Sequence, residues 1–187
     1  MNDLFRRFRN DESGTASLEF VLVFPVFFTF VLMTYESGMI SARHVMLEHG
    51  VDKTVRNVRT GIIPVPDRAL LRQSICDHSR IIPDCMNQLE IELLPRNPTS
   101  WVAIPSNFRC IDRGEVTQVP VEVGESANNQ LMFLRACVRI DPFLPTTGLG
   151  KAVVESNSGT AAGGSYALTA TGAFVVDPFR AVSADDD

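Results

Sequence analysis

Apolar residues are concentrated near the start of the chain. The run from Phe20 to Met33 reads FVLVFPVFFTFVLM and contains no charge. Residues 15–18 and 34–40 extend it to a length that can cross a bilayer, which takes about 20 mostly apolar residues for a hydrocarbon core of about 30 Å. A helix buried in a soluble core would show polar residues every third or fourth position, and here only Thr29 interrupts the run. The pattern therefore predicts a transmembrane helix over residues 15–40.

The charges that flank this run predict its orientation. Arg6, Arg7 and Arg9 precede it, whereas residues 34–42 contain no lysine or arginine. Because positive residues are retained on the cytoplasmic side, the short N-terminus is expected in the cytoplasm and the rest of the chain across the membrane, in a bacterium the periplasm. A cleaved signal peptide is the alternative, but it needs small residues after the apolar run, and Ser41-Ala42 offers only a weak site.

The apolar pattern continues past the span with helical spacing, at intervals of four, four and three residues. Its members are Leu47, Val51, Val55 and Val58. Charged residues take the other faces, and Gly61 with the following Ile-Ile-Pro predicts the end of the helix. One helix is therefore expected over residues 15–60, with residues 41–60 as a periplasmic extension whose apolar stripe covers the following domain. Gly38 and Gly50 are the weak positions of this helix, where a break is expected if one occurs.

Residues 61–187 show no second apolar span and no repeat. Pro64 and Pro66 bound a short linker, and Asp67 is the expected N-cap of a helix over Arg68–His78, with Leu70, Leu71 and Ile75 on one side. The strand candidates are Gln88–Leu94, Asn107–Ile111, Val116–Val123, Leu131–Ile140 and Tyr166–Val176. Several of them alternate apolar and polar residues, as half-buried antiparallel strands do. The stretch Glu155–Ser165 is predicted to be a flexible loop. The expected fold class is α+β, with a helix packed on a small antiparallel sheet.

Composition limits the possible functions. The formal net charge is -5 and only two of the 17 basic residues are lysines, which argues against nucleic-acid binding. All four cysteines lie in the predicted periplasmic part, where an even number favours two disulfides. Three pairings are possible; we favour Cys76–Cys85, which closes a short loop, with Cys110–Cys137 joining neighbouring strands. Free buried thiols are the main alternative, because C-x-x-C and zinc-ligand spacings are absent from the sequence.

No motif in the sequence predicts catalysis. His44 and Glu48-His49 form H-x-x-x-E-H, which is not a metalloprotease pattern, so solvated histidines are expected. The segment Gly148–Lys151 lacks the upstream glycine of a phosphate-binding loop, and G-x-S-x-G does not occur. Asp141 and Asp177 each precede a proline and mark strand ends better than an acid–base pair. Trp101 is expected to anchor a loop or to contact a partner. No catalytic residue, metal ligand or cofactor site is therefore expected.

Two residues of the apolar segment need explanation. Glu19 lies at its beginning, where a carboxylate is costly: about 2.5–3.5 kcal/mol at the centre of a membrane helix and less near its end. Its side chain either reaches back to the cytoplasmic headgroups or is reserved for a partner. Pro25 removes one backbone donor and clashes with the carbonyl of Val21, which predicts a kink or local unwinding near Val21–Pro25. Such a bend either helps subunits to pack or to leave the bilayer, or has no consequence.

The residues around Glu19 carry a family resemblance. A short basic leader ends in Gly14, the fifth residue after it is glutamate, and Phe20 and an apolar helix follow. This order resembles a type IV prepilin processing site, and residues 5–33 are most similar to the TadE-like (TadE or TadF) pseudopilins of the tight-adherence, or Flp type IVb, pilus system. Near the C-terminus, Asp177-Pro178-Phe179-Arg180 resembles an ending common in that family.

The resemblance implies a pilin-like fold and a role in pilus assembly and adhesion. A prepilin peptidase would cut between Gly14 and Thr15, so that residues 1–14 are a leader. Glu19, next to Phe20, would then meet the N-terminal amine of a neighbouring subunit, because a paired charge in hydrocarbon costs far less than a lone one. The implied partners are the prepilin peptidase, other pilins and pseudopilins, and pilus assembly proteins of the bacterial inner membrane. The alternative is an uncleaved single-pass envelope protein that acts as a binding or scaffold module.

Overall fold

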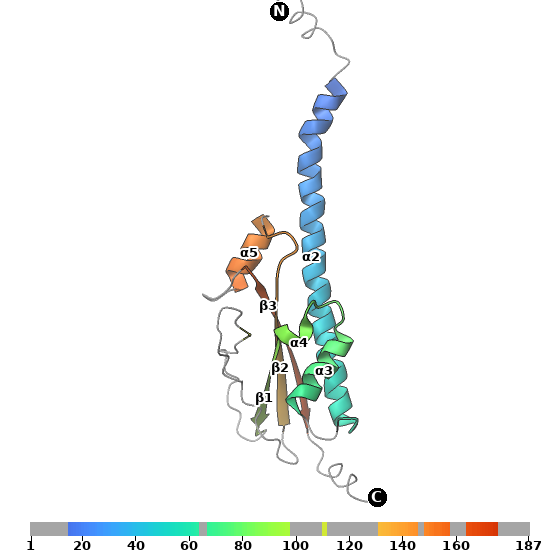
Figure 1. Ribbon diagram of the computed structural model, residues 1–187, viewed down its shortest axis with the longest axis vertical. Helices are drawn as coiled ribbons and strands as arrows, with labels where there is room; N and C mark the ends of the chain where they lie inside the picture. The colour runs from blue at the N-terminus through green and yellow to red at the C-terminus, as the bar shows by residue number, and fades with distance from the viewer. Residues whose placement is uncertain are drawn as a thin grey trace, which may run out of the picture.

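The chain folds as one long helix whose C-terminal half packs on a small sheet domain (Figure 1). The computed structural model describes residues 15–63, 67–97, 110–111, 131–145, 148–157 and 164–175. The elements in chain order are α2 (Thr15–Arg59), α3 (Arg68–His78), α4 (Cys85–Gln88), β1 (Leu89–Arg96), β2 (Leu131–Ile140), α5 (Gly148–Asn157) and β3 (Tyr166–Val175). The predicted α+β class is confirmed.

Helix α2 is continuous over 45 residues and is roughly 67 Å long at 1.5 Å per residue. It ends one residue earlier than predicted, at Arg59. Gly61 has a φ of 75°, its amide donates to the carbonyl of Val58, and the amide of Ile62 donates to that of Asn57. These two hydrogen bonds satisfy carbonyl oxygens of the last helical turn. They require a left-handed backbone conformation at position 61, which glycine adopts without a Cβ clash.

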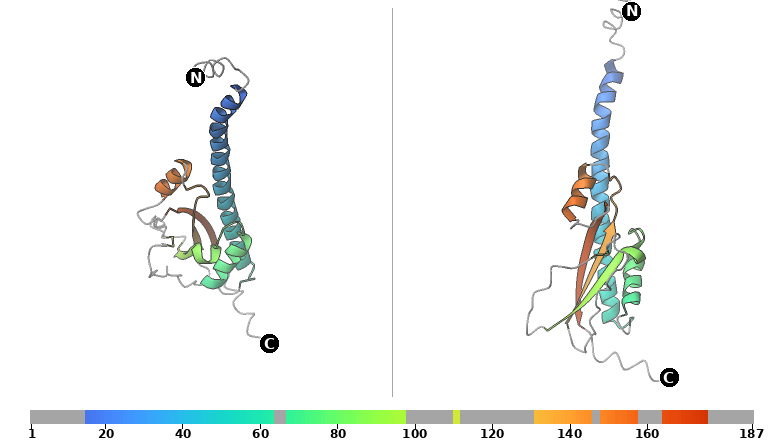
Figure 2. Two further views of the ribbon diagram at one scale, coloured as in Figure 1. Left: turned by 45° about the horizontal axis from the view of Figure 1, so that its top comes forward. Right: turned by 60° about the vertical axis from the view of Figure 1, so that its left-hand side comes forward.

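The three strands form an antiparallel sheet in the order β1-β2-β3. Register places Leu89, Val138 and Leu168 side by side, and most residues on their face of the sheet are buried under α2 and α3. Figure 2 shows α2 and α3 on this side of the sheet. Leu47, Val51 and Val55 of α2 are buried in the core, and Val58 packs against it. The predicted apolar stripe therefore covers the domain as expected.

Two glycines, one in α2 and one in β3, allow neighbouring elements to pack closely against α2. A Cβ at Gly50 would lie 2.2 Å from Oγ of Ser79 and 2.8 Å from the carbonyl oxygen of Ile75, at the contact with α3. A Cβ at Gly172 of β3 would lie 2.8 Å from Cγ2 of Val55. No break occurs at Gly38 or Gly50, the two weak positions of the predicted helix, since α2 runs through both. Gly50 serves packing between helices instead.

Local signals located the other elements with mixed success. Helix α3 begins after Asp67, whose carboxylate accepts a hydrogen bond from the amide of Ala69 at 3.0 Å, as predicted. Leu71 and Ile75 are buried, but Leu70 is 46% exposed and does not share their environment. Strand β2 has its predicted bounds, and β1 and β3 differ from theirs by one or two residues at their ends.

Some expectations failed or lie outside the described residues. Helix α5 was not predicted, and it includes residues 155–157 of the stretch expected to be a loop. Its sequence begins Gly-Leu-Gly, which disfavours a helix, but Gly150 is buried and Val153 packs against the core. Of the strand candidate Asn107–Ile111, residues 110–111 are described and lie outside strands. Val116–Val123, Trp101 and residues 177–180 lie outside the described residues.

Candidate membrane anchor and assembly site

The N-terminal half of α2 carries apolar side chains on every side and meets the sheet domain near its C-terminal end, where the ring of Tyr35 contacts that of Phe143. An 18-residue window of this helix has a mean hydropathy of 2.0, and none of it is buried. Leu18, Val26 and Phe30 are 67%, 64% and 71% exposed. Figure 1 shows this half standing clear of the sheet domain. The helix is long and apolar enough to cross a membrane, as in a single-pass membrane protein.

The length of the free half agrees with the thickness of a bilayer. Going along α2 from Ser17, which is exposed, the first buried residue is Glu36. From Thr15 to Tyr35 the helix rises about 30 Å at 1.5 Å per residue, which equals the thickness of a typical hydrocarbon core of about 30 Å. The domain therefore begins where a spanning helix would leave the membrane.

The residues of the predicted processing site lie at the start of this half. Helix α2 begins at Thr15 in the described chain, while Gly14 lies outside it. Glu19 follows one turn later; its side chain is exposed and has no hydrogen-bond or ion-pair partner among the described residues. Phe20 is 61% exposed. A carboxylate that has no partner among the described residues, on an apolar helix, suits a charged partner.

Pro25 lies inside α2 without interrupting it. The hydroxyl of Thr29 donates to the carbonyl oxygen of Pro25 at 2.7 Å, and that of Thr34 donates to Phe30 at 2.9 Å. Both hydroxyls are thus satisfied within the helix, as polar groups in hydrocarbon need to be. A kink at Pro25 stays a prediction, because the described contacts give no bend angle.

An aromatic ridge runs along one side of the free half. The rings of Phe20 and Phe24 stack with centroids 4.9 Å apart, and those of Phe24 and Phe28 with centroids 5.7 Å apart. The three residues are four positions apart, so they follow one edge of the helix. We name this set the phenylalanine ridge.

A shallow open hollow of about 480 Å³ lies on α2, on a different side of the helix from the phenylalanine ridge. Its lining residues are Phe30, Met33, Thr34, Ser37, Gly38 and Ser41. Glu19, Phe30, Ser37 and Ser41 follow one another at intervals of 11, 7 and 4 residues, and at about 3.6 residues per turn these intervals return to the same side of a helix. We name this side, from Glu19 to Ser41, the hollow face. Beyond the adjacent turns of the helix itself, a Cβ at Gly38 would have no neighbour within 4 Å among the described residues.

Glu36 joins α2 to the domain, and the sequence analysis did not single it out. Its side chain is 1% exposed. Its two carboxylate oxygens accept hydrogen bonds from the backbone amides of Phe143 and Leu144, each at 2.9 Å. These amides belong to residues 141–145, which follow β2. The one available signal was that Glu36 is the only charged residue between Glu19 and Arg43.

Arg43 makes a second polar link about two turns further along α2. Its Nη1 donates to the hydroxyl of Tyr166 at 3.1 Å and to the carbonyl oxygen of Asp141 at 3.5 Å. Tyr166 is fully buried at the start of β3. Burial raises the pKa of its phenol above the usual value, because the phenolate would lose its hydration, while the bond from Arg43 acts in the opposite direction. Glu36 and Arg43 thus fix the end of the sheet that faces the anchor.

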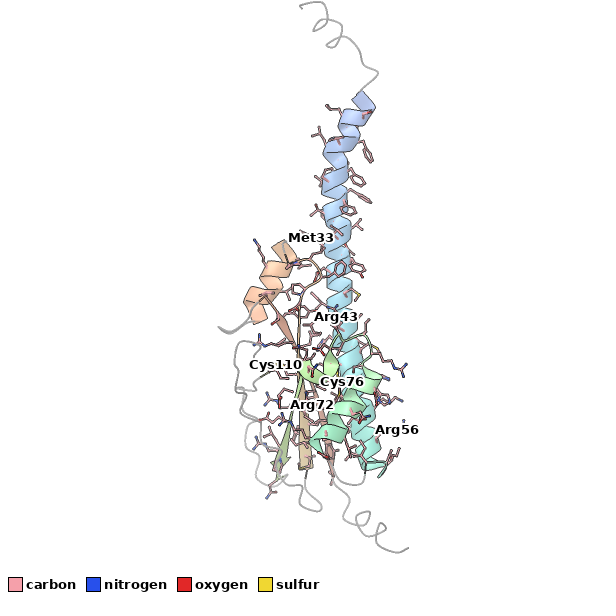
Figure 3. All side chains as sticks on the ribbon, viewed as in Figure 1. Met33, Arg43, Arg56, Arg72, Cys76 and Cys110 are labelled. Carbon is pink, nitrogen blue, oxygen red and sulfur yellow. A yellow bond between two sulfur atoms is a disulfide. The ribbon has the colours of Figure 1, made fainter. Side chains whose placement is uncertain are left out.

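Two disulfides stabilise the domain. Cys76 of α3 is bonded to Cys85 at the start of α4, and Cys110 to Cys137 of β2, with Cα atoms 5.7 Å and 5.3 Å apart. Both pairs are those favoured by the sequence. The expectation that the second bridge joins neighbouring strands was wrong, since Cys110 lies outside any strand. Figure 3 labels Cys76 and Cys110 and shows their positions beside the sheet.

The candidate histidines have different surroundings. His44 Nε2 lies 3.2 Å from the carbonyl oxygen of Thr169 in β3 and 3.6 Å from Oε1 of Glu48. His49 is exposed. His44 is therefore a contact between α2 and β3 rather than a freely solvated side chain, and this contact could not be read from local sequence.

Comparison with protein families identifies the N-terminal segment. Residues 14–56 match the family model described as TadE-like protein. The match extends from the predicted processing site through the free half of α2 and into the half that packs on the domain. The resemblance drawn from Gly14, Glu19 and Phe20 is confirmed over this segment. Comparisons with curated proteins and with solved structures give no match.

Proposed function

We propose that this protein is a non-catalytic, membrane-anchored minor pseudopilin that serves assembly of a tight-adherence (Flp, type IVb) pilus. The observation that carries the proposal is a TadE-like segment whose glutamate, Glu19, is exposed and has no partner among the described residues, on a half-helix whose apolar 18-residue window is not buried. A soluble fold would bury such a surface, so a membrane and neighbouring subunits are its expected surroundings.

In this proposal a prepilin peptidase removes residues 1–14 at the cytoplasmic face of the inner membrane. Glycine at position 14 lets the peptide backbone approach the protease closely, since it has no side chain. The new amine of Thr15 would lie one turn before Glu19. A carboxylate and an ammonium from adjacent subunits would neutralise each other in a medium where either alone is costly.

The hollow face supplies a surface for a neighbouring helix. Glu19 lies at one end of it, and Ser37, Gly38 and Ser41 lie at the other. Small residues let membrane helices approach closely, so that van der Waals contacts and interhelical hydrogen bonds replace contacts with lipid. We propose that another pilin or pseudopilin packs its helix along this face, with the charge pair at the cytoplasmic end.

The sheet domain would lie in the periplasm. Three arginines precede the apolar segment, and the two disulfides on the other side suit an oxidising compartment. The domain would then present surfaces to other pilus assembly proteins, and Glu36 and Arg43 would hold it rigidly on its anchor.

Mass spectrometry of the protein extracted from membranes of piliated cells tests processing. The proposal predicts a polypeptide that begins at Thr15, and a Gly14→Leu variant that keeps residues 1–14 and yields no pili. A Ser13→Ala variant, altered one residue away, is the matched control and should be processed normally. An intact Met1 in cells that make working pili would contradict the proposal and favour the uncleaved envelope protein.

A further inference from the structure

We infer that the rim of the domain nearest the anchor rests on the bilayer surface through the exposed aromatic pair Tyr35 and Phe143. The inference rests on the proposed membrane anchoring of α2 and goes beyond it, because a spanning helix alone does not require its domain to touch lipid. The occupant of this surface is the lipid headgroup region of the leaflet from which α2 emerges.

The two rings form one exposed unit although they are 108 residues apart. Tyr35 is 49% exposed on α2, and Phe143, from the segment that follows β2, is 58% exposed. Their centroids are 5.4 Å apart and their planes meet at 67°, an edge-to-face contact. Aromatic rings that keep half of their surface open at one edge of a domain are unfavourable in water and suited to a partly apolar surface.

The height of the pair agrees with the membrane boundary. Tyr35 lies about 30 Å along the helix from Thr15, which is the thickness of the hydrocarbon core. Amphipathic aromatic side chains are enriched at the level of the headgroups, where the ring meets acyl chains and a polar group meets water. A spanning α2 therefore brings Tyr35 to this level, and Phe143 with it.

The domain is held so that Phe143 cannot leave this level easily. Glu36, the neighbour of Tyr35, accepts hydrogen bonds from the amides of Phe143 itself and of Leu144. Its carboxylate is buried, so both bonds are shielded from water. Arg43 additionally binds the carbonyl of Asp141 at the start of the same segment. The ring thus keeps a fixed position relative to the helix axis.

A second element reaches the same rim. Helix α5 contacts α2, and Figure 3 shows Met33, two residues before Tyr35, beside it. Lys151 on α5 is exposed, and a lysine near a membrane surface is attracted to anionic headgroups. Anionic lipid should therefore strengthen the contact that the aromatic pair makes between the domain and the bilayer.

Tryptophan reporters in lipid vesicles test the inference. Because the chain has a single tryptophan, Trp101, Trp101→Phe provides a background for one reporter at a time: Phe143→Trp at the rim, Val175→Trp as control, and Phe27→Trp within the anchor. Val175 is 47% exposed at the far end of β3. The full chain is reconstituted, without other proteins, in phosphatidylcholine–phosphatidylglycerol vesicles whose acyl chains carry bromine near the headgroups or near the bilayer centre.

We expect the F143W emission to be quenched several-fold more than that of V175W by shallow bromines, and F27W to be quenched most by deep ones. Equal quenching of F143W and V175W alongside a quenched F27W would overturn the inference and leave the anchor intact. An unquenched F27W would instead overturn the membrane anchoring and the proposed function with it.

A measurement on the wild-type chain covers the case in which a reporter variant does not fold. Vesicles containing a lipid with a photoreactive headgroup are irradiated, and the attached peptides are identified by mass spectrometry. Labelling of a peptide that contains Phe143, several-fold above one that contains Val175, supports the inference. Labelling of α2 but not of residues 141–145 contradicts the inference, because the domain then does not contact the membrane. In that case Phe143 is available to a protein partner instead.

Discussion

The two halves of α2 form one helix but differ in how apolar residues are distributed around its axis. From Ser17 to Tyr35 the helix is apolar on all sides and is not buried, whereas from Glu36 to Arg59 it is amphipathic and buries one stripe in the domain core. The boundary falls at a carboxylate bound by two backbone amides. Hydrophobicity therefore indicates the surroundings of a helix only together with its distribution around the axis: an all-round pattern suits lipid, and a stripe suits a core.

Removing one apolar side chain from each half should give the largest contrast. Leu47 is fully buried in the core, while Phe27 is 63% exposed. Leu47→Ala should lower the free energy of unfolding of the domain by about 2–5 kcal/mol, because it leaves a cavity. Phe27→Ala should change it by less than about 0.5 kcal/mol, as exposed positions usually do. Denaturant unfolding in detergent, followed by circular dichroism, measures both. Equal losses would show that the halves are not independent.

Filling the hollow should affect assembly without affecting the fold. The Cβ of Gly38→Leu meets no atom of the described residues within 4 Å beyond the adjacent turns of its own helix. The longer side chain would push away a helix packed on the hollow face at a cost of about 1–3 kcal/mol, or roughly 5- to 150-fold in association. Val21→Phe is the matched control, since Val21 is 65% exposed and lies nine residues, or about two and a half turns, from Phe30, on the opposite side. Pilus yield per cell is the readout. Equal yields from both variants would exclude the hollow face as a subunit contact.

The same small substitution should act differently at two glycines of α2. Gly50→Ala places a Cβ against Ser79 and the backbone of Ile75, which should cost about 1–3 kcal/mol in packing. Gly38→Ala meets nothing within 4 Å and should gain up to about 1 kcal/mol from helix propensity. The difference in unfolding free energy between these two variants measures how closely α3 approaches the helix. A Gly50→Ala variant as stable as Gly38→Ala would contradict the observed packing.

The smallest expected effect is a pH dependence at the junction. The folded pKa of Tyr166 is raised, so the stability that this group contributes is fully present below its unfolded pKa of about 10 and is lost as the pH rises through the folded value. Unfolding free energies measured over about 3 pH units around that reference value, from about pH 8 to about pH 11, should fall more steeply for the wild type than for Tyr166→Phe. If the stability curves of the wild type and of Tyr166→Phe were parallel over this pH range, Tyr166 would be excluded as the titrating group.

What the sequence could predict is what local patterns determine. The course of α2, the cap at Asp67 and the bounds of β2 follow from residue spacing and turn chemistry, and the structure has them as expected within a residue. Glu36 and Arg43 could not be interpreted in the same way. Their partners are Phe143, Leu144 and Tyr166, more than 100 residues away, and only the folded sheet brings them together. Helix α5 was missed for a related reason, because its contacts with the core outweigh a glycine-rich start.

The most direct test of the account is a charge comparison between the two halves of α2. Glu19 and Glu48 are both exposed glutamates of the same helix, one on the free half and one on the domain half. Pilus yield is measured for Glu19→Gln and Glu48→Gln, with membrane levels and the N-terminal residue of each variant determined by mass spectrometry. We expect E19Q to be processed at Gly14 but to yield few or no pili, and E48Q to assemble like the wild type. Normal piliation by E19Q would contradict the claim that this carboxylate on the free half-helix pairs neighbouring subunits.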